Sequence, residues 1–584
     1  MMSGIRADTP DEFKGKFTLN DFSGGMRRNV DPSLLNENEY AVLQNGRNRG
    51  GSIATIKGPN DLTGLIPAGI KQGIYGFNNI LIVMCSGHAY GRDFSDETAG
   101  FNLIPGLLMD EFVDRIYAEI VPASWQNLKR ELEDETDVQA GVRLVSEVFG
   151  TPAALVVQDG TTRPWLVFTT GNARPAKDFG DWRNDEDAEE DTREYVPIGK
   201  QMMYSDAGIL YIISPDGTEI YRSVTGRPLD FVIAIDTDGN KLAPLSSGKP
   251  EASRLSYRLA YDPITCIRNV PSAPRVQDEE VGFYVSTKSN SWLVYPTYRQ
   301  TLFGEPIFTK QTLFPTGALN QFSLTDILGD TGIISESGIT SFNSILTASN
   351  EGKNLPFHDY IHKLFEGIIQ SITCCITSDN YAFFGVQSIY GGGILVYDTL
   401  RKQYTSFDVF PEITGYIKQF AEIKVTGQRK LFFITSGDQL FEAFAGETST
   451  CKLYTKEFTA PEAEVQLIPR RVRLLFADIL ETGEVTVTIF VNGKPGTPMT
   501  KTVSVGTNPP QTIPIAFPFG TIDAETTKNK TFTIEQPIKG VTIGIQVDFN
   551  FAAELQQIEL IVDGEEGAAT DVEQGEIFNE VKTI

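Results

Sequence analysis

The sequence predicts an all-β protein: an irregular β-propeller of six to eight blades with helical insertions, followed by a C-terminal β-sandwich. Three observations predict this fold class. The 584 residues include 37 Phe and 20 Tyr, and aromatic side chains fit pleated strands better than helices. Short apolar runs recur in pairs around Gly, Asp or Ser turns. The chain is also too long for one ordinary core, so a repeat architecture or several domains are expected.

Residues 1–60 contain few strand-like runs and many turn-forming residues. The segment Asn36–Leu43 begins with a possible Asn N-cap and predicts one short helix. A brief strand is expected at Ser52–Lys57, closed by Gly58-Pro59. Because this segment has little apolar core of its own, we expect an extended arm that docks on a neighbouring subunit or on an adaptor protein.

Residues 61–457 repeat one pattern, in which a short apolar run and a polar turn precede a second run that contains an aromatic residue. Such paired runs are typical of β-hairpins. From residue 333 onward they recur at roughly 50-residue intervals, the period of a four-stranded propeller blade. A row of sandwiches is the alternative, but it does not require hairpins at a fixed interval. The seven predicted hairpins pair 80–84 with 89–90, 154–157 with 165–168, 208–213 with 219–221, 282–285 with 292–295, 332–334 with 339–342, 382–386 with 394–397, and 431–434 with 439–441.

A helical insertion into the propeller is expected at about 105–150. Leu108, Phe112, Ile116 and Ile120 recur at four-residue spacing, which predicts an amphipathic helix over 107–121. Ser124 is a candidate N-cap for a second helix, which runs through Leu128 and Leu132.

Two further features interrupt the predicted strands. An apolar stripe over 358–370 predicts another helix. Residues 184–194 are almost all acidic or polar, so an acidic, solvated loop is expected there.

From about residue 458 the pattern changes to strict alternation of apolar and polar residues. Glu484–Val491 alternates in this way and ends at Asn492-Gly493, the dipeptide that favours a tight hairpin turn. Further strands are expected at 541–547 and 555–562. The region 458–563 therefore predicts a compact β-sandwich, and the Gly- and Glu-rich end, 564–584, predicts a flexible tail.

The formal net charge is −26 and the pI is about 4.6. Such a surface repels phosphate backbones, so sequence-specific nucleic-acid binding is not expected. An acidic surface could still line a conduit through which DNA slides without sticking. The alternative is that the charge serves solubility alone.

The cysteines and the apolar runs indicate the compartment. Five Cys without C-x-x-C spacing predict neither a zinc ribbon nor a disulfide framework. The segment Met1–Lys16 lacks the apolar core of a secretory signal. No apolar run of about 18 residues predicts a membrane-spanning segment. We therefore expect a soluble protein that folds in a reducing cytoplasm.

The sequence predicts no catalytic residue, no cofactor and no metal site. His358 and His362 have the spacing of zinc proteases, but Asp359 replaces the Glu of that motif and no further His remains to complete a site. Cys374 and Cys375 begin a strand-like run, which favours buried core thiols. Walker loops, Gly-x-Ser-x-Gly elbows and dinucleotide fingerprints are absent from the sequence.

Glycoside hydrolysis is the main enzymatic alternative, because propellers host it and two carboxylates suffice. With 76 Asp and Glu, however, chance carboxylate pairs are everywhere. Ser214–Thr218 is similar to the turn repeats of sialidase propellers, but its Gly directly follows the Asp and the motif is not repeated. We expect a plain Asp-Gly hairpin turn there.

The most specific pattern lies in the first 58 residues: Phe22-x-Gly24-Gly25, Asp31-Pro32, Leu35-x-x-x-Glu39, Asn45-x-Arg47-x-Arg49-Gly50 and Ile53-x-x-x-Lys57-Gly58. With it the chain resembles the tail nozzle proteins, also called tail tubular protein B, of short-tailed bacteriophages. Lys57 departs from the Arg expected at that place. Further matches cover the arm and the propeller but leave the C-terminal sandwich unmatched; they are Tyr195–Lys200, Gly208–Tyr211, Ile220–Ser223, Gly226–Phe231, Val396–Thr399 and Tyr404–Ser406.

The resemblance implies a structural, non-enzymatic ring protein, usually sixfold, that lies below the portal and adaptor. Its bore would retain the DNA genome and then conduct it during ejection. Adaptor or portal-proximal proteins, tail fibres and other copies of the chain are the implied partners. The implied location is the virion tail, after assembly in the host cytoplasm. The alternative function is a glycan-binding or glycan-cleaving propeller at the tail tip; a cellular propeller scaffold would be expected to carry Trp-Asp repeat endings, which are missing.

The implied assembly interface consists of Phe22, Gly24, Gly25, Asn45, Arg47 and Arg49. In this hypothesis Phe22 is an apolar anchor, and the two glycines allow close backbone approach or a positive φ. The arginines would pair with carboxylates at a subunit or adaptor boundary. For each residue the alternative is an ordinary intrachain turn or a surface charge.

Overall fold

The structure of the protein is a computed structural model. It describes residues 13–77, 79–103, 114–121, 141–146, 152–158, 165–170, 201–205, 208–214, 216–218, 220–222, 254–255, 262–270, 282–300, 306–313, 316–327, 329–336, 338–343, 359–460, 465–504, 528–534 and 539–566. The predicted acidic loop 184–194, the predicted helix after Ser124 and His358 lie outside these residues, as does nearly all of the predicted tail 564–584.

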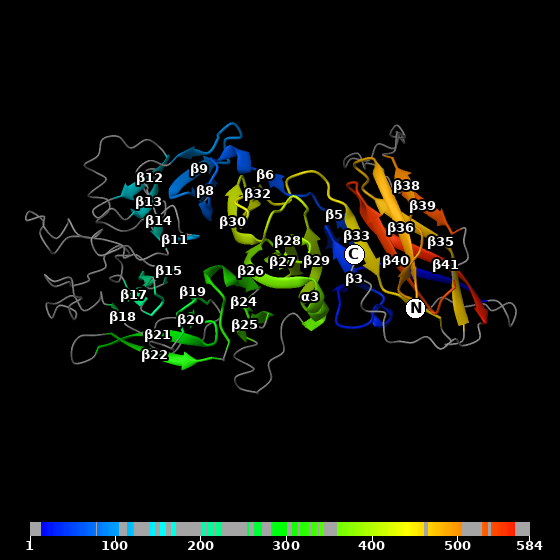
Figure 1. The fold of residues 1–584 in the computed structure, drawn as a ribbon, viewed down its shortest axis with the longest axis horizontal. Coiled ribbons are helices and arrows are strands. Elements are labelled where there is room, and N and C mark those ends of the chain that lie inside the picture. The colour runs from blue at the N-terminus through cyan, green and yellow to red at the C-terminus, as the bar shows by residue number, and fades with distance from the viewer. Residues whose placement is uncertain are drawn as a thin grey trace, which may run out of the picture.

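The left-hand part of the molecule in Figure 1 is built of small antiparallel sheets, of which the described residues form seven. Six sheets have four strands and one has three. Blade 1 comprises β7 (Lys71–Phe77), β8 (Ile80–Cys85), β9 (His88–Asp93) and β10 (Asn102–Leu103); blade 2, β11 (Ile116–Val121), β12 (Gly141–Ser146), β13 (Pro152–Gln158) and β14 (Trp165–Thr170); blade 3, β15 (Gln201–Tyr204), β16 (Leu210–Ile213), β17 (Ile220–Arg222) and β18 (Arg254–Leu255).

The second half of the propeller continues in the same way. Blade 4 comprises β19 (Cys266–Asn269), β20 (Phe283–Ser286), β21 (Ser291–Gln300) and β22 (Pro306–Thr312); blade 5, β23 (Leu324–Ile327), β24 (Asp330–Ser335) and β25 (Gly338–Ser341); blade 6, β26 (Ile369–Ser378), β27 (Tyr381–Ser388), β28 (Gly391–Asp398) and β29 (Gln403–Val409); blade 7, β30 (Ile417–Val425), β31 (Gln428–Thr435), β32 (Leu440–Glu442) and the early strand β6 (Asn60–Asp61).

These sheets follow one another around a closed circle. The strands β7, β11, β15 and β19 contact their neighbours in turn, and β23, β26 and β30 complete the round, where β30 contacts β7. The step from β19 to blade 5 runs through the 3-10 turn η5 (Gln321–Ser323), which precedes β23. In blade 7, Phe441 of β32 pairs with Asp61 of β6, so an N-terminal strand closes the last blade. The fold is the all-β propeller that the hairpin repeat predicts.

The seven predicted hairpins are all present, and each lies in its own blade as two adjacent antiparallel strands. The Asp-Gly turn is also as predicted: the amide of Thr218 donates to the carboxylate of Asp216, and Gly217 has a φ of 76°.

The predicted helix over 107–121 is wrong in its last part, because Ile116–Val121 is the strand β11. Residues 107–113 lie outside the described residues. The register pairs Ile116 with Thr170 and continues to Val121 with Trp165. Four-residue spacing places side chains on one face of a helix, but it does the same in a strand of period two. The apolar spacing of Ile116 and Ile120 therefore fits a helix and a strand equally well. Pairing with β14 makes this segment a strand.

The helix predicted over 358–370 is present but shorter. The 3-10 turn η6 (Asp359–Ile361) leads into α3 (His362–Gly367), and β26 begins at Ile369. Among the described residues no helix is long and apolar enough to cross a membrane.

The right-hand part of Figure 1 consists of two sheets that share one hydrophobic core. The outer sheet contains β1 (Phe13–Leu19), β4 (Gly46–Arg49), β5 (Ser52–Thr55), β35 (Val465–Ala477), β39 (Lys528–Thr533) and β41 (Glu554–Glu566). The second sheet contains β2 (Gly25–Met26), β3 (Glu39–Gln44), β33 (Cys451–Thr455), β34 (Phe458–Thr459), β36 (Gly483–Val491), β37 (Lys494–Pro495), β38 (Met499–Val503) and β40 (Thr542–Phe549). Phe476 and Phe549 meet between the sheets with ring centroids 5.3 Å apart.

Two features of this sandwich differ from the predicted domain limits. The arm supplies β1 to β5, so the segment 1–60 is no separate unit in the described residues. The strand β33 begins at Cys451, before the predicted limit of 458, and β41 continues past 563 to Glu566. The predicted turn at Asn492-Gly493 is present, with both residues at positive φ.

The helix predicted over Asn36–Leu43 is wrong, because Glu39–Gln44 forms β3. Tyr40 of this strand pairs with Thr455 of β33, and Leu43 pairs with Leu453. Both Tyr40 and Leu43 are fully buried. Tertiary packing against a strand far along the chain thus overrides a weak local helix preference.

Candidate assembly interface at the junction of arm, propeller and sandwich

Phe22 lies in the large hydrophobic core that the sandwich shares with blades 5 and 6. Its side chain is 1% exposed and belongs to the same cluster as Tyr404 and Phe407 of β29. Its amide donates to the carbonyl of Gly51, and its carbonyl accepts from the side-chain amide of Asn48. Phe22 is therefore buried within its own chain, and its printed hydrogen bonds are to Asn48 and Gly51 of the arm.

Gly24 and Gly25 provide the close approach that the sequence predicts. Gly25 has a φ of 77°, and a Cβ at this position would lie 2.8 Å from the carbonyl oxygen of Tyr404. A Cβ on Gly24 would lie 2.8 Å from the carbonyl oxygen of Asn38. The backbone of the arm therefore passes too close to β29 for any other residue at position 25 without displacement.

Asn45 binds the end of β29 through its backbone and its side chain. Its amide donates to Oδ1 of Asp408 at 3.0 Å, and its side-chain amide donates to the carbonyl of Val409 at 3.2 Å. The amide of Val409 donates back to Oδ1 of Asn45 at 3.0 Å. Asn45 has a φ of 52°, a conformation that Asn tolerates better than most residues.

Arg47 and Asp408 form a buried ion pair beside Asn45. Arg47 Nη1 lies 2.6 Å from Asp408 Oδ2, and it also donates to Oγ of Ser406 at 2.7 Å. The guanidinium lies 4.8 Å from the ring centroid of Phe444. Burial raises the pKa of the Asp408 carboxyl, whereas Arg47 and the hydrogen bonds act to lower that pKa. With Asp408 fully buried, each charge depends on the other for compensation.

Further contacts in the junction come from residues that the sequence did not single out. Tyr40 Oη donates to the carbonyl of Thr405 at 2.9 Å, and Gln403 Nε2 donates to the carbonyl of Ser23 at 2.6 Å. Arg401 Nη1 reaches the carbonyl of Asn48 at 3.4 Å. These partners are more than 350 residues apart, and no local pattern identifies them. The only sequence signal nearby was Tyr404–Ser406, in a segment that resembles a closing strand.

The structure therefore divides the six predicted interface residues. Five of them make contacts within their own chain, which was the alternative to an interface between subunits: Phe22, Gly24, Gly25, Asn45 and Arg47. Arg49 differs, because its side chain is 66% exposed and only a 3.6 Å contact joins it to Glu554.

The centre of the propeller is crossed by side chains from opposite blades. Tyr117 of blade 2 stacks on Phe322 of η5, with ring centroids 6.0 Å apart and an interplanar angle of 6°. The guanidinium of Arg115 lies 5.2 Å from the same Phe322 ring. Gln321 Nε2 donates to the carbonyl of Met202 in blade 3 at 3.0 Å. Aromatic and polar side chains thus link blades 2, 3 and 5 across the axis.

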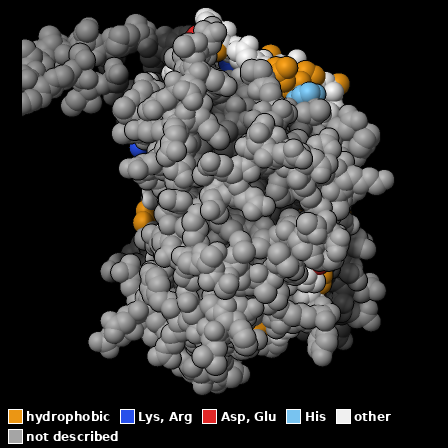
Figure 2. Space-filling view, turned by 90° about the vertical axis from the view of Figure 1, so that its left-hand side faces the viewer, with side chains coloured by type: hydrophobic (Ala, Val, Ile, Leu, Met, Phe, Trp, Pro, Cys, Tyr) orange, Lys and Arg blue, Asp and Glu red, His pale blue; other side chains and the backbone are white. Residues whose placement is uncertain are grey.

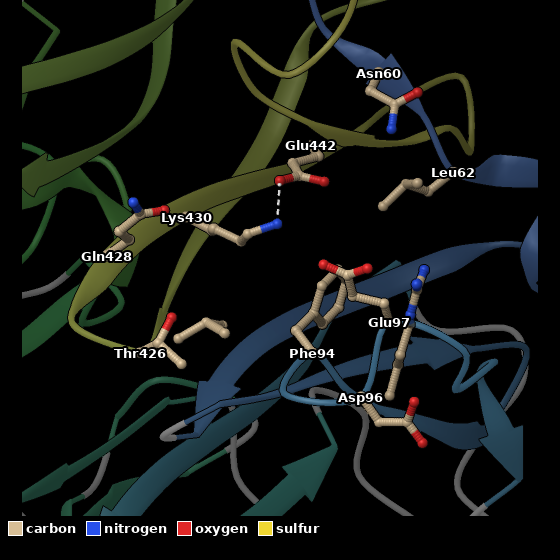
Figure 3. Close-up of a pocket in the computed structure, with 11 residues that line it drawn as sticks. Asn60, Leu62, Phe94, Asp96, Glu97, Thr426, Gln428, Lys430 and Glu442 are labelled. Atoms are coloured by element: carbon tan, nitrogen blue, oxygen red, sulfur yellow. Dashed lines mark hydrogen bonds and ion pairs between the residues drawn. The ribbon is translucent and has the colours of Figure 1, made fainter.

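A pocket of about 410 Å³ lies where blade 7 meets blade 1 (Figure 3). Lys430 Nζ lies 3.0 Å from Glu442 Oε1, and Arg92 lies over the Phe94 ring at 4.5 Å. Hydrogen bonds from the Thr98 hydroxyl and amide lower the pKa of the Asp96 carboxyl. A glycosidase acid needs a raised carboxyl pKa, so the lowered pKa of Asp96 does not fit that role.

A short apolar loop is exposed on the propeller next to β7. Leu65 is 51% exposed and Ile70 is 37% exposed. The buried ammonium of Lys71 holds this loop by donating to the carbonyls of Pro67 at 3.0 Å and Gly69 at 3.3 Å. Figure 2 shows the propeller end of the molecule, where hydrophobic side chains gather at the upper edge beside a histidine.

The thiols and histidines that the structure describes form neither a disulfide nor a metal-binding group. All five Cys are free and buried, and the predicted core positions of Cys374 and Cys375 are confirmed. Burial raises the pKa of Cys266 and of Cys374 to about 12. His362 pairs with Glu366 at 3.0 Å on an exposed helix turn. The described residues contain no group of three or more His, Cys, Asp or Glu that could hold a metal ion.

No protein-family model matches this chain, and no curated protein matches it. Solved structures do match. Virginiamycin B lyase from Staphylococcus aureus is 11% identical, with a TM-score of 0.30, over 66% of this chain and 97% of its own. YCF48 from Cyanidioschyzon merolae is 10% identical, with a TM-score of 0.24, over 66% of this chain and 98% of its own. The Dos1 propeller is 12% identical, with a TM-score of 0.27, over 68% of this chain and 83% of its own. At these identities the matches concern the propeller fold alone, and function has to be inferred from this chain's own residues.

Proposed function

We propose that this chain is a structural subunit of a bacteriophage tail, of the nozzle type. In this proposal several copies form a ring below the portal and adaptor, and the ring retains the DNA genome and then conducts it during ejection. The observation that carries the proposal is that the arm residues behind the resemblance to tail nozzle proteins meet in one junction with β29. Gly25, Asn45 and Arg47 contact blade 6 there, and Phe22 is buried in the core that blade 6 shares with the sandwich. These contacts support a fixed connection between propeller and sandwich.

A rigid connection suits a ring subunit, because a ring closes only when each copy presents its two interfaces at a fixed angle. Three kinds of interaction act at the boundary between the propeller and the sandwich. They are the burial of Phe22, the Arg47–Asp408 ion pair and the hydrogen bonds of Asn45. Bending of the propeller against the sandwich would have to break them together. The geometry of a subunit is thereby set before it meets a neighbour.

The aromatic stack at the centre of the propeller favours a DNA passage outside the single propeller. Tyr117 and Phe322 stack across the propeller axis, so a passage for DNA would be the bore between copies rather than the channel of one propeller. The net charge of −26 supports such a bore, because an acidic wall does not retain phosphates.

The test is the composition and structure of phage particles that encode this chain. Mass spectrometry of purified particles should detect it, and antibodies against it should label the tail in electron micrographs. Absence of the chain from particles would overturn the proposal. A glycan array with the purified full chain separates the alternative, since specific glycan binding or sugar release would favour a tip protein that acts on glycans.

A further inference from the structure

The outer face of the outer sheet carries the opposite charge from the rest of the protein. Arg471, Arg473 and Leu475 of β35 point away from the core, because Val472 and Leu474 between them are fully buried. On β41, Glu559 and Ile561 lie on the same outer face, opposite Arg473 and Arg471. Lys16 of β1 pairs in register with Ile561 and extends this face.

Cations outnumber carboxylates on this face among the side chains that the structure describes. Five cations stand against three carboxylates, an excess of two in a chain of net charge −26: Lys16, Arg49, Arg470, Arg471 and Arg473 against Glu554, Glu559 and Asp563. Each carboxylate is paired, at 2.5 Å and 3.5 Å for Glu559, 3.6 Å for Glu554 and 2.7 Å for Asp563. Arg471 is exposed and has no ion pair in this set. The face therefore offers positive charge for an incoming carboxylate.

A groove of about 610 Å³ adjoins this face at its end nearest the propeller. The residues that line it include the carboxylate Asp21 as well as Arg49, Ser52, Leu475 and Gln557. With Asp21 counted, the face and groove together hold five cations and four carboxylates. Arg49 is the one residue of the predicted interface whose side chain is mostly exposed. The groove therefore adds shape and the apolar contact of Leu475 to the cationic face.

We propose that this cationic face and groove are the docking surface for a second copy of the chain, which approaches with carboxylates. The inference rests on the proposed ring function and deepens it. Arginine is enriched in protein interfaces, and Leu475 and Ile561 supply apolar area between the charges. Complementary charge selects an acidic partner and repels a wrong one, and every copy of this chain is strongly acidic outside this face. Docking of this face on a different surface of the next copy is a head-to-tail contact, which forms a closed ring when the rotation between copies divides a full turn.

DNA is the other polyanion that such a face could attract. The paired carboxylates Glu554, Glu559 and Asp563 lie among the cations and would meet phosphates at close range. The apolar side chains of Leu475 and Ile561 also have nothing to bind on the phosphate backbone of DNA. The mixed pattern favours a protein partner over nucleic acid.

The test is the assembly of the purified full chain as a function of concentration and salt, followed by native mass spectrometry and analytical ultracentrifugation. The variant Arg471→Glu with Arg473→Glu should weaken association at least tenfold, while the melting temperature of the monomer stays unchanged because both side chains are exposed. The matched control Lys424→Glu with Lys494→Glu carries the same charge change on exposed sites elsewhere and should assemble like the unchanged chain. Association should also weaken with added salt.

Unchanged assembly of the Arg471→Glu, Arg473→Glu variant would overturn the inference, and two further measurements then say what the surfaces do. Loss of assembly on Leu65→Ser with Ile70→Ser would assign the docking to the apolar loop of blade 1. Loss of duplex DNA binding in the arginine variant would assign the cationic face to nucleic acid. Each can occur while the chain is still found in phage tails, so failure here is distinguishable from failure of the proposed function.

Discussion

At the scale of single residues, the junction between arm and propeller depends on charge that is buried and compensated. Arg47 and Asp408 are each nearly or fully buried, and they lie 2.6 Å apart. A buried ion pair adds little net stability compared with two apolar residues, but removal of one partner leaves an uncompensated charge. The pair therefore favours one position of β4 against β29, the one in which Arg47 and Asp408 meet.

Loss of either partner alone should be costly. We expect Arg47→Met and Asp408→Leu each to lower the free energy of unfolding by about 3–5 kcal/mol, and the double variant to cost less than either one. Melting curves and urea titrations measure this. Arg49→Met is the matched control, with a change of about 1 kcal/mol or less because Arg49 is exposed. Strict additivity of the two single variants would contradict the buried-pair interpretation.

The buried thiols give a pH dependence with a defined sign. Burial raises the pKa of Cys266 to about 12 from its ordinary value of 9.0, so the folded state favours the protonated thiol. This contribution is fully present below pH 9 and is lost as the pH rises from 9 toward 12. Melting temperatures at pH 8 and pH 10.5 should therefore fall less in Cys266→Ala than in the unchanged chain. Equal falls in both proteins would show that this thiol is not the cause.

At the scale of elements, the propeller depends on close approach between neighbouring blades. Gly76 of β7 faces β30 where the circle closes, and a Cβ at this position would collide with the carbonyl oxygen of Glu422. Gly64 lies in the 3-10 turn η2 (Thr63–Leu65) before β7, and a Cβ there would have no atom within 4 Å. The two glycines thus differ in packing while they lie twelve positions apart.

Substitution at these two glycines should separate the closure of the circle from general stability. Gly76→Ala should cost about 1–3 kcal/mol, because the two strands must move apart. Gly64→Ala should change stability by no more than about 0.5 kcal/mol. Thermal unfolding of both variants checks the difference, and equal melting temperatures would contradict the closure of blade 7 on blade 1.

The elements also show what a sequence can and cannot predict. The seven hairpins and the Asn492-Gly493 turn were predictable, because strand periodicity and turn chemistry are local. The strands β3 and β11 were not, because each is decided by a partner distant in the chain: Leu453 faces Leu43, and Thr170 faces Ile116. The same limit applies to the junction, where the sequence identified Asn45 and Arg47 but not Asp408.

At the scale of the whole molecule, one chain combines a filled propeller, a rigidly joined sandwich and a cationic face on an acidic body. The Tyr117–Phe322 stack links blades 2 and 5, and the proposal therefore places DNA between copies instead of inside one propeller. The rigid junction fixes the angle between the propeller and the sandwich. In the proposed ring, the cationic face is the surface of each copy that attracts the next. Together these features are the basis of the proposal of a ring subunit whose conduit lies between copies.

The most direct test is a cryo-electron microscopy reconstruction of the tail of particles that contain this chain. We expect a closed ring of copies in which the cationic face of each sandwich, around Arg471 and Arg473, contacts its neighbour. DNA density should lie on the ring axis, outside every propeller, with Tyr117 and Phe322 still stacked. Isolated copies with no ring, or DNA threaded through a propeller centre, would contradict this organisation.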